Sequence, residues 1–292
     1  MKISFIVLTY NRSDALLAVL RSLAMQCSTD HEVLVADDGS NPFEVELLYR
    51  NCPSFKCPVR HVWHADTGFT AAAARNLGAY HARGEYLVFL DGDCVPNASF
   101  VEAHAQLAGQ GFFVNGSRVL LSEGLTRQVV EDKLELSIQP MAFWWRARIR
   151  GDSNKLLHVL SWPLSLFRVK QGFRWCGIRS CNLGVWRQDF AAVNGFDETF
   201  EGWGHEDADL VLRLSHLGIR RKNGFLATEV FHLWHKENKR DQESSNKQKV
   251  FQRMKTHLIL AEKGLHEIVA EGAGKVTLLQ RQPETHPQIL PL

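Results

Sequence analysis

Short apolar runs alternate with helical patterns along the first third of the chain. The runs expected to form strands are Ile3–Leu8, Glu32–Ala36, Val59–Trp63 and Glu85–Leu90. Between them, residues 13–24 place leucines on one helical stripe with Asn11 or Ser13 as the cap, and residues 70–83 form an alanine-rich helix. This alternation predicts an α/β fold in which helices cover a mostly parallel sheet.

From about residue 111 the pattern becomes less regular. The segments expected to be regular are a strand at 113–121, a strand at 182–186 and a helix at 206–216. The polar run 236–249 is expected to be a surface loop or the start of an exposed helix, and residues 251–260 form an amphipathic pattern. The end of the chain carries three prolines without periodicity, so we expect disorder from residue 266.

Three polar clusters follow expected strands directly. They are Thr9–Arg12, Asp37–Ser40 and Asp91–Asp93. In sheets of this kind functional side chains collect at the carboxyl ends of the strands. The sequence therefore predicts a site at this edge of the sheet.

Residues 9–13 contain no glycine, which excludes a dinucleotide fingerprint and a P-loop after the first strand. A divalent cation held by carboxylates is the usual alternative for neutralising phosphate. Asp91 and Asp93 end a buried strand, and Gly92 between them allows close backbone approach. A cation at Asp93 would stabilise the charge that builds on a diphosphate leaving group. The same Asp-x-Asp pattern also occurs in ordinary loops, whereas an EF-hand is excluded because no further ligands follow at the required spacing.

Two further features of the first half of the chain can be interpreted either as ordinary structure or as part of a binding site. The cluster Asp37–Ser40 is either a turn or places a carboxylate where it accepts hydrogen bonds from a base or a ribose. Arg75, on the alanine-rich helix, either faces a diphosphate or base or is an exposed helix arginine. Both interpretations stay open on these residues alone.

A second acidic cluster begins the helix expected at 206–216. Glycines at 202 and 204 flank Trp203, and the acids that open the helix are Glu206, Asp207 and Asp209. Acids in a first helical turn are favoured by the helix dipole, so this is in part a well-capped helix, and Asp209 can pair with Arg213 four residues on. A free carboxylate in a cleft would also suit a general base that takes a proton from an acceptor hydroxyl.

Two histidines lie three residues apart beside an apolar run. His232 and His235 are interpreted as metal ligands, His232 more than His235, although a lone histidine is usually structural.

Composition narrows the class of protein. The chain has 292 residues, 45% hydrophobic and 23% charged, which suits one large α/β domain or two small ones. A formal net charge of +2 gives no case for nucleic acid as the main partner. We see no signal peptide and no apolar run of membrane-spanning length, so we expect a cytoplasmic protein or one peripheral on the cytosolic membrane face.

The six cysteines are expected to be free thiols. Cys52 with Cys57 and Cys176 with Cys181 could be split zinc ligands, but paired ligands in structural zinc sites are typically spaced more closely.

The order of these motifs resembles the family-two inverting glycosyltransferases of the GT-A fold. The first-half segments that carry the resemblance are Thr9–Arg12, Asp37–Ser40, Ala74–Asn76 and Asp91–Asp93. Residues 194–198 and 203–209 resemble the carboxyl-terminal half of β-galactosyltransferases and of chondroitin-type polymerase modules. The match covers about residues 1–236. It implies a Rossmann-like nucleotide-binding sheet continuous with a smaller acceptor-side subdomain: a nucleotide-sugar-binding half at 1–110, an acceptor and catalytic half at 111–265, and a tail at 266–292.

The resemblance implies a role for each matching residue on the donor side. The residues that would hold the nucleotide are Thr9, Tyr10, Arg12, Asp38 and Arg75. Asp91 would contact the ribose or the metal shell. Asp93 and His232 would bind Mn²⁺ or Mg²⁺, with His235 as the less favoured ligand.

On the acceptor side, the resemblance makes Asp207 the base of a single-displacement reaction. Glu206 would orient donor or acceptor hydroxyls, and Trp203 would form the wall on which the sugar stacks. The implied partners are a UDP-sugar donor and a glycan or lipid-linked glycan acceptor, with peripheral membrane contact and no nucleic acid. Surface polysaccharide or lipooligosaccharide synthesis is the expected setting.

Three features fit the resemblance less well. Family members of the galactosyltransferase type often carry glycine where His205 sits, so His205 could alter donor or acceptor choice. Gln171–Trp175 matches a signature of processive, membrane-embedded synthases, but it precedes Asp207 instead of following it, and we interpret it as chance. The tryptophan- and arginine-rich stretch 144–179 is either an acceptor-side subdomain with tryptophans in its core or a surface for a lipid-linked, anionic acceptor.

Two other functions compete with the transferase. A nucleotidyltransferase would need a glycine-rich, basic loop after the first strand, and residues 10–12 do not provide one. A catalytically degenerate nucleotide-sugar or carbohydrate-binding protein would have no need for Asp93, Asp207 and His232 together. Weak nucleotide-sugar binding without turnover would favour it.

Overall fold

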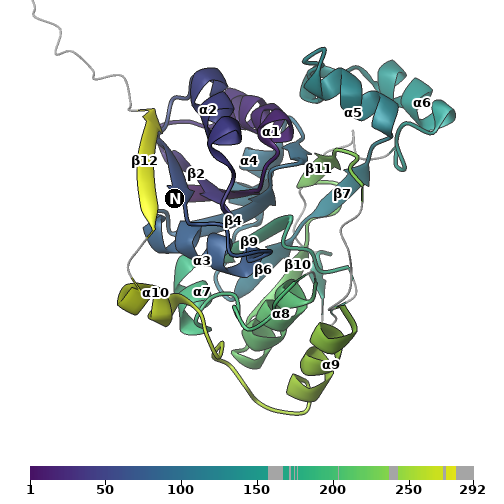
Figure 1. The fold of residues 1–292 in the computed structure, drawn as a ribbon. Helices are drawn as coiled ribbons and strands as arrows, with labels where there is room; N and C mark the ends of the chain where they lie inside the picture. The colour runs from purple at the N-terminus through teal and green to yellow at the C-terminus, as the bar shows by residue number, and fades with distance from the viewer. Residues whose placement is uncertain are drawn as a thin grey trace, which may run out of the picture.

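The larger sheet runs through both halves of the chain (Figure 1). The computed structural model describes residues 1–156, 167–170, 172–173, 175, 177–202, 204–236, 243–271 and 274–280. In spatial order the strands of this sheet are β12 (Lys275–Gln280), β3 (Val59–Trp63), β2 (His31–Asp37), β1 (Ile3–Thr9), β4 (Tyr86–Asp91), β9 (Asn182–Trp186), β6 (Phe112–Asn115), β10 (Arg220–Asn223) and β8 (Val169–Lys170). A smaller sheet is formed by β5 (Cys94–Pro96), β11 (Glu229–His232) and β7 (Ser117–Leu120).

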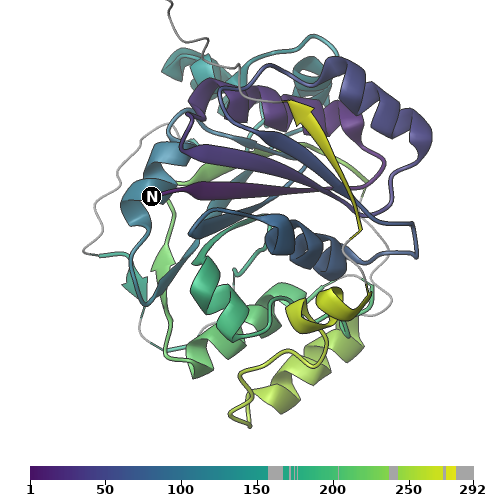
Figure 2. The same cartoon turned by 90° about the vertical axis from the view of Figure 1, so that its left-hand side faces the viewer.

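Helices cover both faces of the larger sheet, as Figure 2 shows. They are α1 (Ser13–Gln26), α2 (Pro42–Asn51), α3 (Ala71–His81), α4 (Phe100–Leu107), α5 (Glu123–Val130), α6 (Met141–Arg150), α7 (Arg187–Ala192), α8 (Glu206–His216), α9 (Glu243–Arg253) and α10 (Leu265–Glu271), with a 3₁₀ turn η1 at Leu136–Ile138. Alternate residues of β1 serve the two faces: Phe5 and Val7 pack in the core that contains α1 and α4, and Ile6 packs in the core that contains α3, α7 and α8. An unbroken apolar run is therefore required in β1, because both faces are buried.

The expected parallel sheet is confirmed for the first half of the chain. β3, β2, β1 and β4 are parallel neighbours. Beyond β4 the sheet is mixed, because β9 lies antiparallel between β4 and β6 while β10 runs parallel to β6. The strands of the second half thus extend the first-half sheet.

The strand expected over 113–121 is two strands in different sheets. β6 ends at Asn115 in the larger sheet, and β7 begins at Ser117 in the smaller one. A Cβ atom on Gly116 would lie 2.0 Å from the side chain of Asn182, so only glycine fits where the chain crosses between the sheets.

The expected cap of the first helix was wrong. Arg12 precedes α1 without a side-chain capping bond, because Asn11 has a φ of 49° and Ser13 donates its N–H and O–H to Glu44. The exposed-helix interpretation of the polar run holds from Glu243, and α9 extends to Arg253, so it includes the first residues of the amphipathic pattern over 251–260.

The expectation of disorder from residue 266 is wrong for two elements. α10 ends at Glu271, and β12 pairs antiparallel with β3 from Lys275 to Gln280. β12 is six residues long and stabilised by pairing with a strand near the other end of the chain, which local periodicity does not reveal. Residues 281–292 lie outside the described part of the chain.

Within the described residues, no helix combines the length and apolar character that crossing a bilayer requires.

Candidate active site

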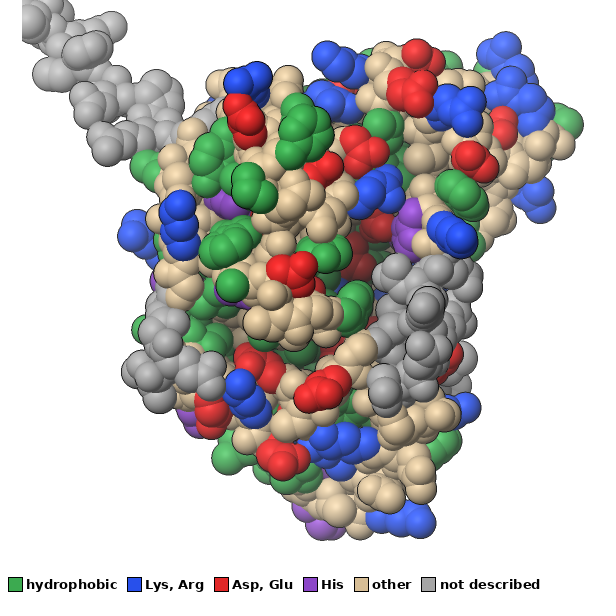
Figure 3. Space-filling model, viewed as in Figure 1, with side chains coloured by type: hydrophobic (Ala, Val, Ile, Leu, Met, Phe, Trp, Pro, Cys, Tyr) green, Lys and Arg blue, Asp and Glu red, His purple; other side chains and the backbone are tan. Residues whose placement is uncertain are grey.

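The carboxyl ends of β2, β1 and β4 lie side by side. Thr9 pairs with Asp37, and Leu8 pairs with Asp91. After Asp91 the chain crosses the end of β1, where the Gly92 N–H donates to the Leu8 carbonyl at 2.7 Å. A Cβ atom on Gly92 would lie 2.7 Å from that oxygen, so glycine is required for the crossing. Figure 3 shows a hollow on this side of the molecule in which acidic side chains gather, with a histidine at its rim.

Asp93 and the two predicted histidines converge. β5 pairs antiparallel with β11 so that His232 lies opposite Cys94. The Asp93 Oδ2 atom is 3.2 Å from His235 Nε2 and 3.8 Å from His232 Nε2. Burial alone would raise the pKa of Asp93, but the hydrogen bond from His235 and the nearby imidazoles outweigh it and hold that pKa below its ordinary value. The structure thus brings together all three predicted metal ligands.

Asp93, His232 and His235 form what is called the metal corner below, and their side chains are of the kinds that bind a divalent cation. Ligand atoms of Asp93, Cys94 and His232 lie within 4.8 Å of one another. The His235 Nδ1 atom is 2.9 Å from the Lys236 carbonyl, so an Nδ1–H donated there would leave Nε2 directed at Asp93, as in many metal-ligating histidines. Carboxylate with imidazole suits Mn²⁺ better than Mg²⁺, which prefers oxygen alone. Burial and the neighbouring Cys181 thiol raise the pKa of Cys94, which disfavours the thiolate form that binds metals.

Arg75 joins the end of β4 to the start of α8. It is 3% exposed, and its guanidinium lies 2.9 Å from Asp91 Oδ1 and 3.2 Å from Glu206 Oε1. Burial would lower the pKa of Arg75, but these two carboxylates raise it, so the charge is retained. The alternative of an exposed helix arginine is wrong. The predicted contact of Arg75 with nucleotide stays a prediction, since these two nitrogens already bind carboxylates.

Asp207 sits at the same helix start with a raised pKa. The Asp207 Oδ1 atom accepts a hydrogen bond from the Ala208 N–H of α8 at 2.7 Å. Its Oδ2 atom accepts one from the Ser180 N–H at 3.2 Å. Burial, and then the adjacent Glu206 charge, raise the pKa of Asp207 to about 7. A carboxylate that ionises near neutral pH is matched to general-base work.

The other predicted acid of this helix, Asp209, is structural. It is fully buried, and its Oδ2 accepts from Arg213 at 2.7 Å, which confirms the predicted pair. Its Oδ1 accepts from Arg253 of α9 at 2.7 Å, and Arg253 also lies 2.7 Å from Asp197. This buried network fixes α8 against α9 and positions the helix that carries Asp207.

Asp38 is held by the segment before α3. Its carboxylate accepts from the N–H and O–H of Thr70 at 3.0 and 2.5 Å and lies 3.3 Å from His64. The following Gly39 has a φ of 95°, and a Cβ atom there would lie 2.5 Å from Asp66 Cα. Asp38 is only 3% exposed, so its predicted contact with a nucleotide would use the lone pairs that these bonds leave.

The remaining donor-side residues differ in exposure. Thr9 is buried at the end of β1, whereas Tyr10 is 46% exposed and donates its hydroxyl to Asp66 at 3.0 Å. Arg12 is part-exposed and pairs with Asp14 at 3.0 Å. The hydrogen bond with Asp93 raises the pKa of His235, and the positive charge of Arg12 opposes that rise. Arg12 therefore adds positive charge beside the metal corner.

Trp203, predicted as the sugar-stacking wall, lies outside the described residues. His205 caps α8 with a φ of 74°, a conformation that favours glycine, which explains why glycine would suit this position. Its ring lies 5.4 Å from that of Trp175. His205 is thus a strained residue two positions before Asp207.

The sequence did not reveal the residues that form hydrogen bonds with the predicted site carboxylates. Ser180 donates to Asp207 across 27 positions of sequence, and Thr70 donates to Asp38 across 32. Neither lies in a motif, so no local signal could have found them. Cys94 directly follows Asp93 and could have been considered with it. The zinc interpretation of Cys52 with Cys57 is not supported, because Cys57 contacts Cys27, while Cys176 lies outside the described residues.

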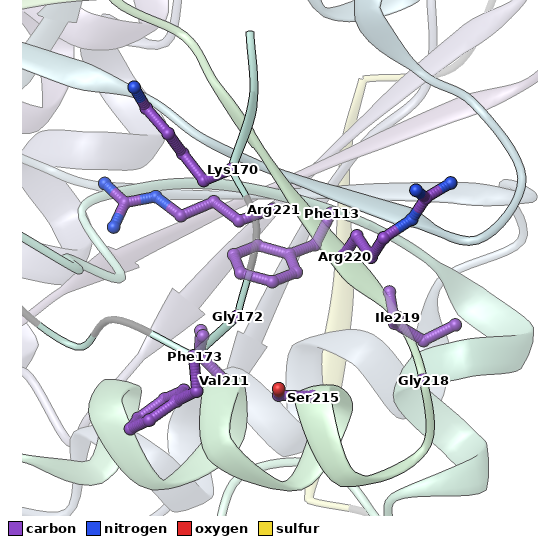
Figure 4. Close-up of a pocket in the computed structure, with 10 residues that line it drawn as sticks. All are labelled: Phe113, Lys170, Gly172, Phe173, Val211, Ser215, Gly218, Ile219, Arg220 and Arg221. Carbon is purple, nitrogen blue, oxygen red and sulfur yellow. The ribbon is translucent and has the colours of Figure 1, made fainter.

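A separate cavity of about 180 Å³ lies between β10 and α8 (Figure 4). Phe113, Phe173, Val211 and Ile219 give it an apolar lining. Figure 4 shows the basic side chains around it pointing outward, in two opposite directions. None of the predicted site residues that the structure describes lines this cavity.

The chain is similar in sequence to glycosyltransferases and to glycan synthases. The chain is 29% identical over 232 residues to validoxylamine A glucosyltransferase of Streptomyces hygroscopicus subsp. jinggangensis, covering 74% of this chain and 52% of that protein. It is 26% identical over 233 residues to chondroitin synthase of Escherichia coli, covering 74% and 32%. An uncharacterized glycosyltransferase of Haemophilus influenzae is 38% identical over 206 residues, covering 60% and 67%. The chain thus spans about half of the first relative.

Solved structures show the same fold. The crystal structure of residues 1–349 of Staphylococcus aureus TarS superposes with a TM-score of 0.55 at 17% identity, covering 91% of this chain and 68% of that one. The same TarS segment in complex with UDP-GlcNAc also gives a TM-score of 0.55, at 18% identity, covering 93% and 71%.

Family models divide the chain near β8. Residues 164–236 match the model described as the N-terminal domain of galactosyltransferase. Residues 4–170, more than half of the chain, match glycosyl transferase family 2. With its GT-A architecture and with Asp93, His232 and Asp207 at the end of the sheet, the chain belongs to glycosyl transferase family 2.

Proposed function

We propose that this protein transfers a sugar from a UDP-sugar to a hydroxyl of a glycan or glycolipid acceptor, with inversion and with a divalent metal. One observation carries the proposal: a carboxylate with two histidines and a carboxyl of raised pKa share one end of the sheet. Asp91 connects the two, since it binds Arg75 beside Glu206 and Asp207 and also faces His232, whose pKa is lowered by burial against the opposing charges of Asp93 and Asp91. Metal binding and proton removal would therefore take place around one shared set of charges.

The chain's own residues would do two things in such a transfer. Asp207, ionised near neutral pH, would take the proton of the acceptor hydroxyl as its oxygen attacks the anomeric carbon. Arg75 would hold Glu206 in place beside it, so that the helix start is positioned before substrate binds.

Asp93, His232 and His235 would hold Mn²⁺, with Mg²⁺ as the alternative. The cation would supply positive charge for the departing diphosphate. Arg12, which pairs with Asp14, would add positive charge at the same corner, where the hydrogen bond with Asp93 raises the pKa of His235 and the charge of Arg12 opposes that rise.

Names of relatives support the donor and acceptor class. TarS was solved with UDP-GlcNAc and with UDP, and the curated relatives include chondroitin and hyaluronan synthases. These names favour a UDP-sugar donor and a glycan acceptor. Surface polysaccharide or lipooligosaccharide synthesis in the cytosol, or on the cytosolic membrane face, remains the proposed setting.

The test measures nucleoside diphosphate released from a panel of nucleotide sugars, with Mn²⁺ and with chelator. We expect slow hydrolysis of one UDP-sugar that needs metal and is lost in Asp93→Ala and in Asp207→Asn. Asp93→Ala should also weaken metal-dependent nucleotide binding, whereas Asp207→Asn should keep it.

Asp189→Asn is a matched control, because Asp189 is an aspartate on α7 outside the site. It should retain activity. Nucleotide-sugar binding without turnover across the panel would contradict the proposal and favour a catalytically degenerate binding protein.

A further inference from the structure

Helix α6 has one face in the core and the opposite face in solvent. Trp144 is 2% exposed and stacks on Phe231 of β11, with ring centroids 4.7 Å apart and planes 8° from parallel. Met141, Trp145 and Ile149 are 37%, 53% and 79% exposed. Since residues four apart share one helix face, these three form a continuous apolar stripe, called the α6 stripe below. The adjacent tryptophans of this helix thus have opposite roles, one in the core and one on the surface.

Arginines border the α6 stripe on both sides. At about 100° per residue, Arg146 and Arg150 fall on one side of the stripe and Arg148 on the other. Arg150 pairs with Asp152 at 2.9 Å, whereas Arg146, which donates to the Ala142 carbonyl, and Arg148 form no ion pair within the described residues. Figure 3 shows Lys and Arg side chains, with some Asp and Glu side chains among them, at the end of the molecule that α5 and α6 form.

This arrangement matches the physics of an interfacial helix. An amphipathic helix in the plane of a membrane places its apolar side chains among the upper acyl chains, while flanking arginines extend to the headgroup phosphates. Tryptophan is favoured at that depth because its ring is apolar and its N–H is polar. From the stripe and its arginine borders we infer that α6 docks this protein on an anionic phospholipid surface.

The position of α6 in the fold agrees with a docking role. Figure 1 shows α5 and α6 projecting together at the end of the molecule where β7 and β11 lie. Ile138, in the turn just before α6, is another apolar side chain in this part of the chain that is exposed, at 71%. Because Trp144 packs on Phe231, and His232 follows Phe231 in β11, docking would hold the metal corner close to the lipid surface. The inference goes beyond the proposed transferase activity, since lipid binding requires neither donor nor metal.

The test is co-sedimentation of the purified full chain with vesicles, without nucleotide or metal. One set is phosphatidylcholine alone, and the other is equal parts of phosphatidylcholine and phosphatidylglycerol. We expect binding to the anionic vesicles that weakens as salt is raised, because part of the attraction is electrostatic. The double variant Trp145→Ser with Ile149→Ser should weaken binding by about tenfold or more.

Two further variants separate the contributions. Arg146→Glu with Arg148→Glu should weaken binding to anionic vesicles by about tenfold, because two attractive charges become repulsive. Phe43→Ser removes a ring that is 65% exposed on α2 and should leave binding unchanged. Circular dichroism would verify that each variant is folded. No binding by the wild-type chain, equal binding to both vesicle sets, or binding that survives loss of the α6 stripe would each overturn the inference.

Discussion

At the scale of single residues, Asp207 keeps its proton to a higher pH than an ordinary aspartate. Burial and the charge of Glu206 raise the pKa of Asp207 to about 7. A general base must be ionised, so kcat/KM should rise with pH up to about 7 and then level off. Asp207→Asn should lower kcat/KM by about 10²–10⁴-fold and abolish this limb of the profile. The measurement is a pH–rate profile of both proteins.

Glu206→Gln provides the internal check on that assignment. The Glu206 charge contributes to the raised pKa of Asp207, so its removal should move the midpoint of the profile to lower pH. An unchanged midpoint in a folded Glu206→Gln protein would mean that the observed titration belongs to another group.

The grouping of candidate metal ligands was predictable from sequence, because each ligand lies in a motif that follows a strand. Asp93, His232 and His235 were expected together and lie together. Asp37 and Asp38 show the limit of this reasoning. Asp38 binds Thr70 near the site, whereas Asp37 accepts from the Ser40 N–H and contacts His61 in the protein interior. Two adjacent aspartates look equivalent in sequence, and only the non-local partners distinguish them.

At the scale of elements, α3 packs on the sheet through a glycine. A Cβ atom on Gly78 would lie 2.8 Å from Ile6 Cγ2 and 3.2 Å from the Ala36 Cβ. Gly78→Ala should therefore destabilise the protein, because overpacking costs about 1–3 kcal/mol and exceeds the gain in helix propensity of about 1 kcal/mol. Urea unfolding of the wild-type and variant proteins measures the difference.

Gly124→Ala is the matched control for that substitution. Gly124 lies in the first turn of α5, where the nearest heavy atom to an added Cβ is Ser122 Oγ at 3.9 Å. The same chemical change should leave stability unchanged or raise it by up to about 1 kcal/mol. Equal destabilisation at both positions would show that packing of α3 on Ile6 is not the cause.

Element boundaries were predictable where one signal dominates. The bounds expected for β3, β9 and α8 agree with the structure, because an apolar run or an acidic helix start marks each of them. α2 was not predicted, although Asn41 caps it and Pro42 is its first residue, which are both readable signals. The smaller sheet was beyond local reasoning, since β5, β7 and β11 are short and pair across long stretches of chain.

At the scale of the whole molecule, a buried ionic network joins α8, α9 and the segment before α8. Burial would raise the pKa of Asp197, but hydrogen bonds from Thr199 and from the Glu262 N–H, together with Arg253, lower it to about 2. A depressed pKa gives stability that is present above the ordinary value near 4 and is lost as pH falls through about 2. This carboxylate should therefore contribute about 2 kcal/mol to the pH dependence of unfolding in that range.

Urea unfolding at a series of acidic pH values tests this contribution. Asp197→Asn should flatten the loss of stability between about pH 4 and pH 2. Asp189→Asn should act with the opposite sign and at higher pH, because burial raises the pKa of Asp189 above its ordinary value, so that its ionisation opposes folding as pH rises through the raised pKa. A wild-type acid slope retained in Asp197→Asn would assign the effect to other carboxylates.

The place of β12 has a consequence for how the chain is made. β3 and the strand that pairs with its outer edge are separated in sequence by every other strand that follows β3. Until residues 275–280 have been synthesised, the outer edge of β3 therefore offers unpaired backbone groups to other nascent chains or to chaperones.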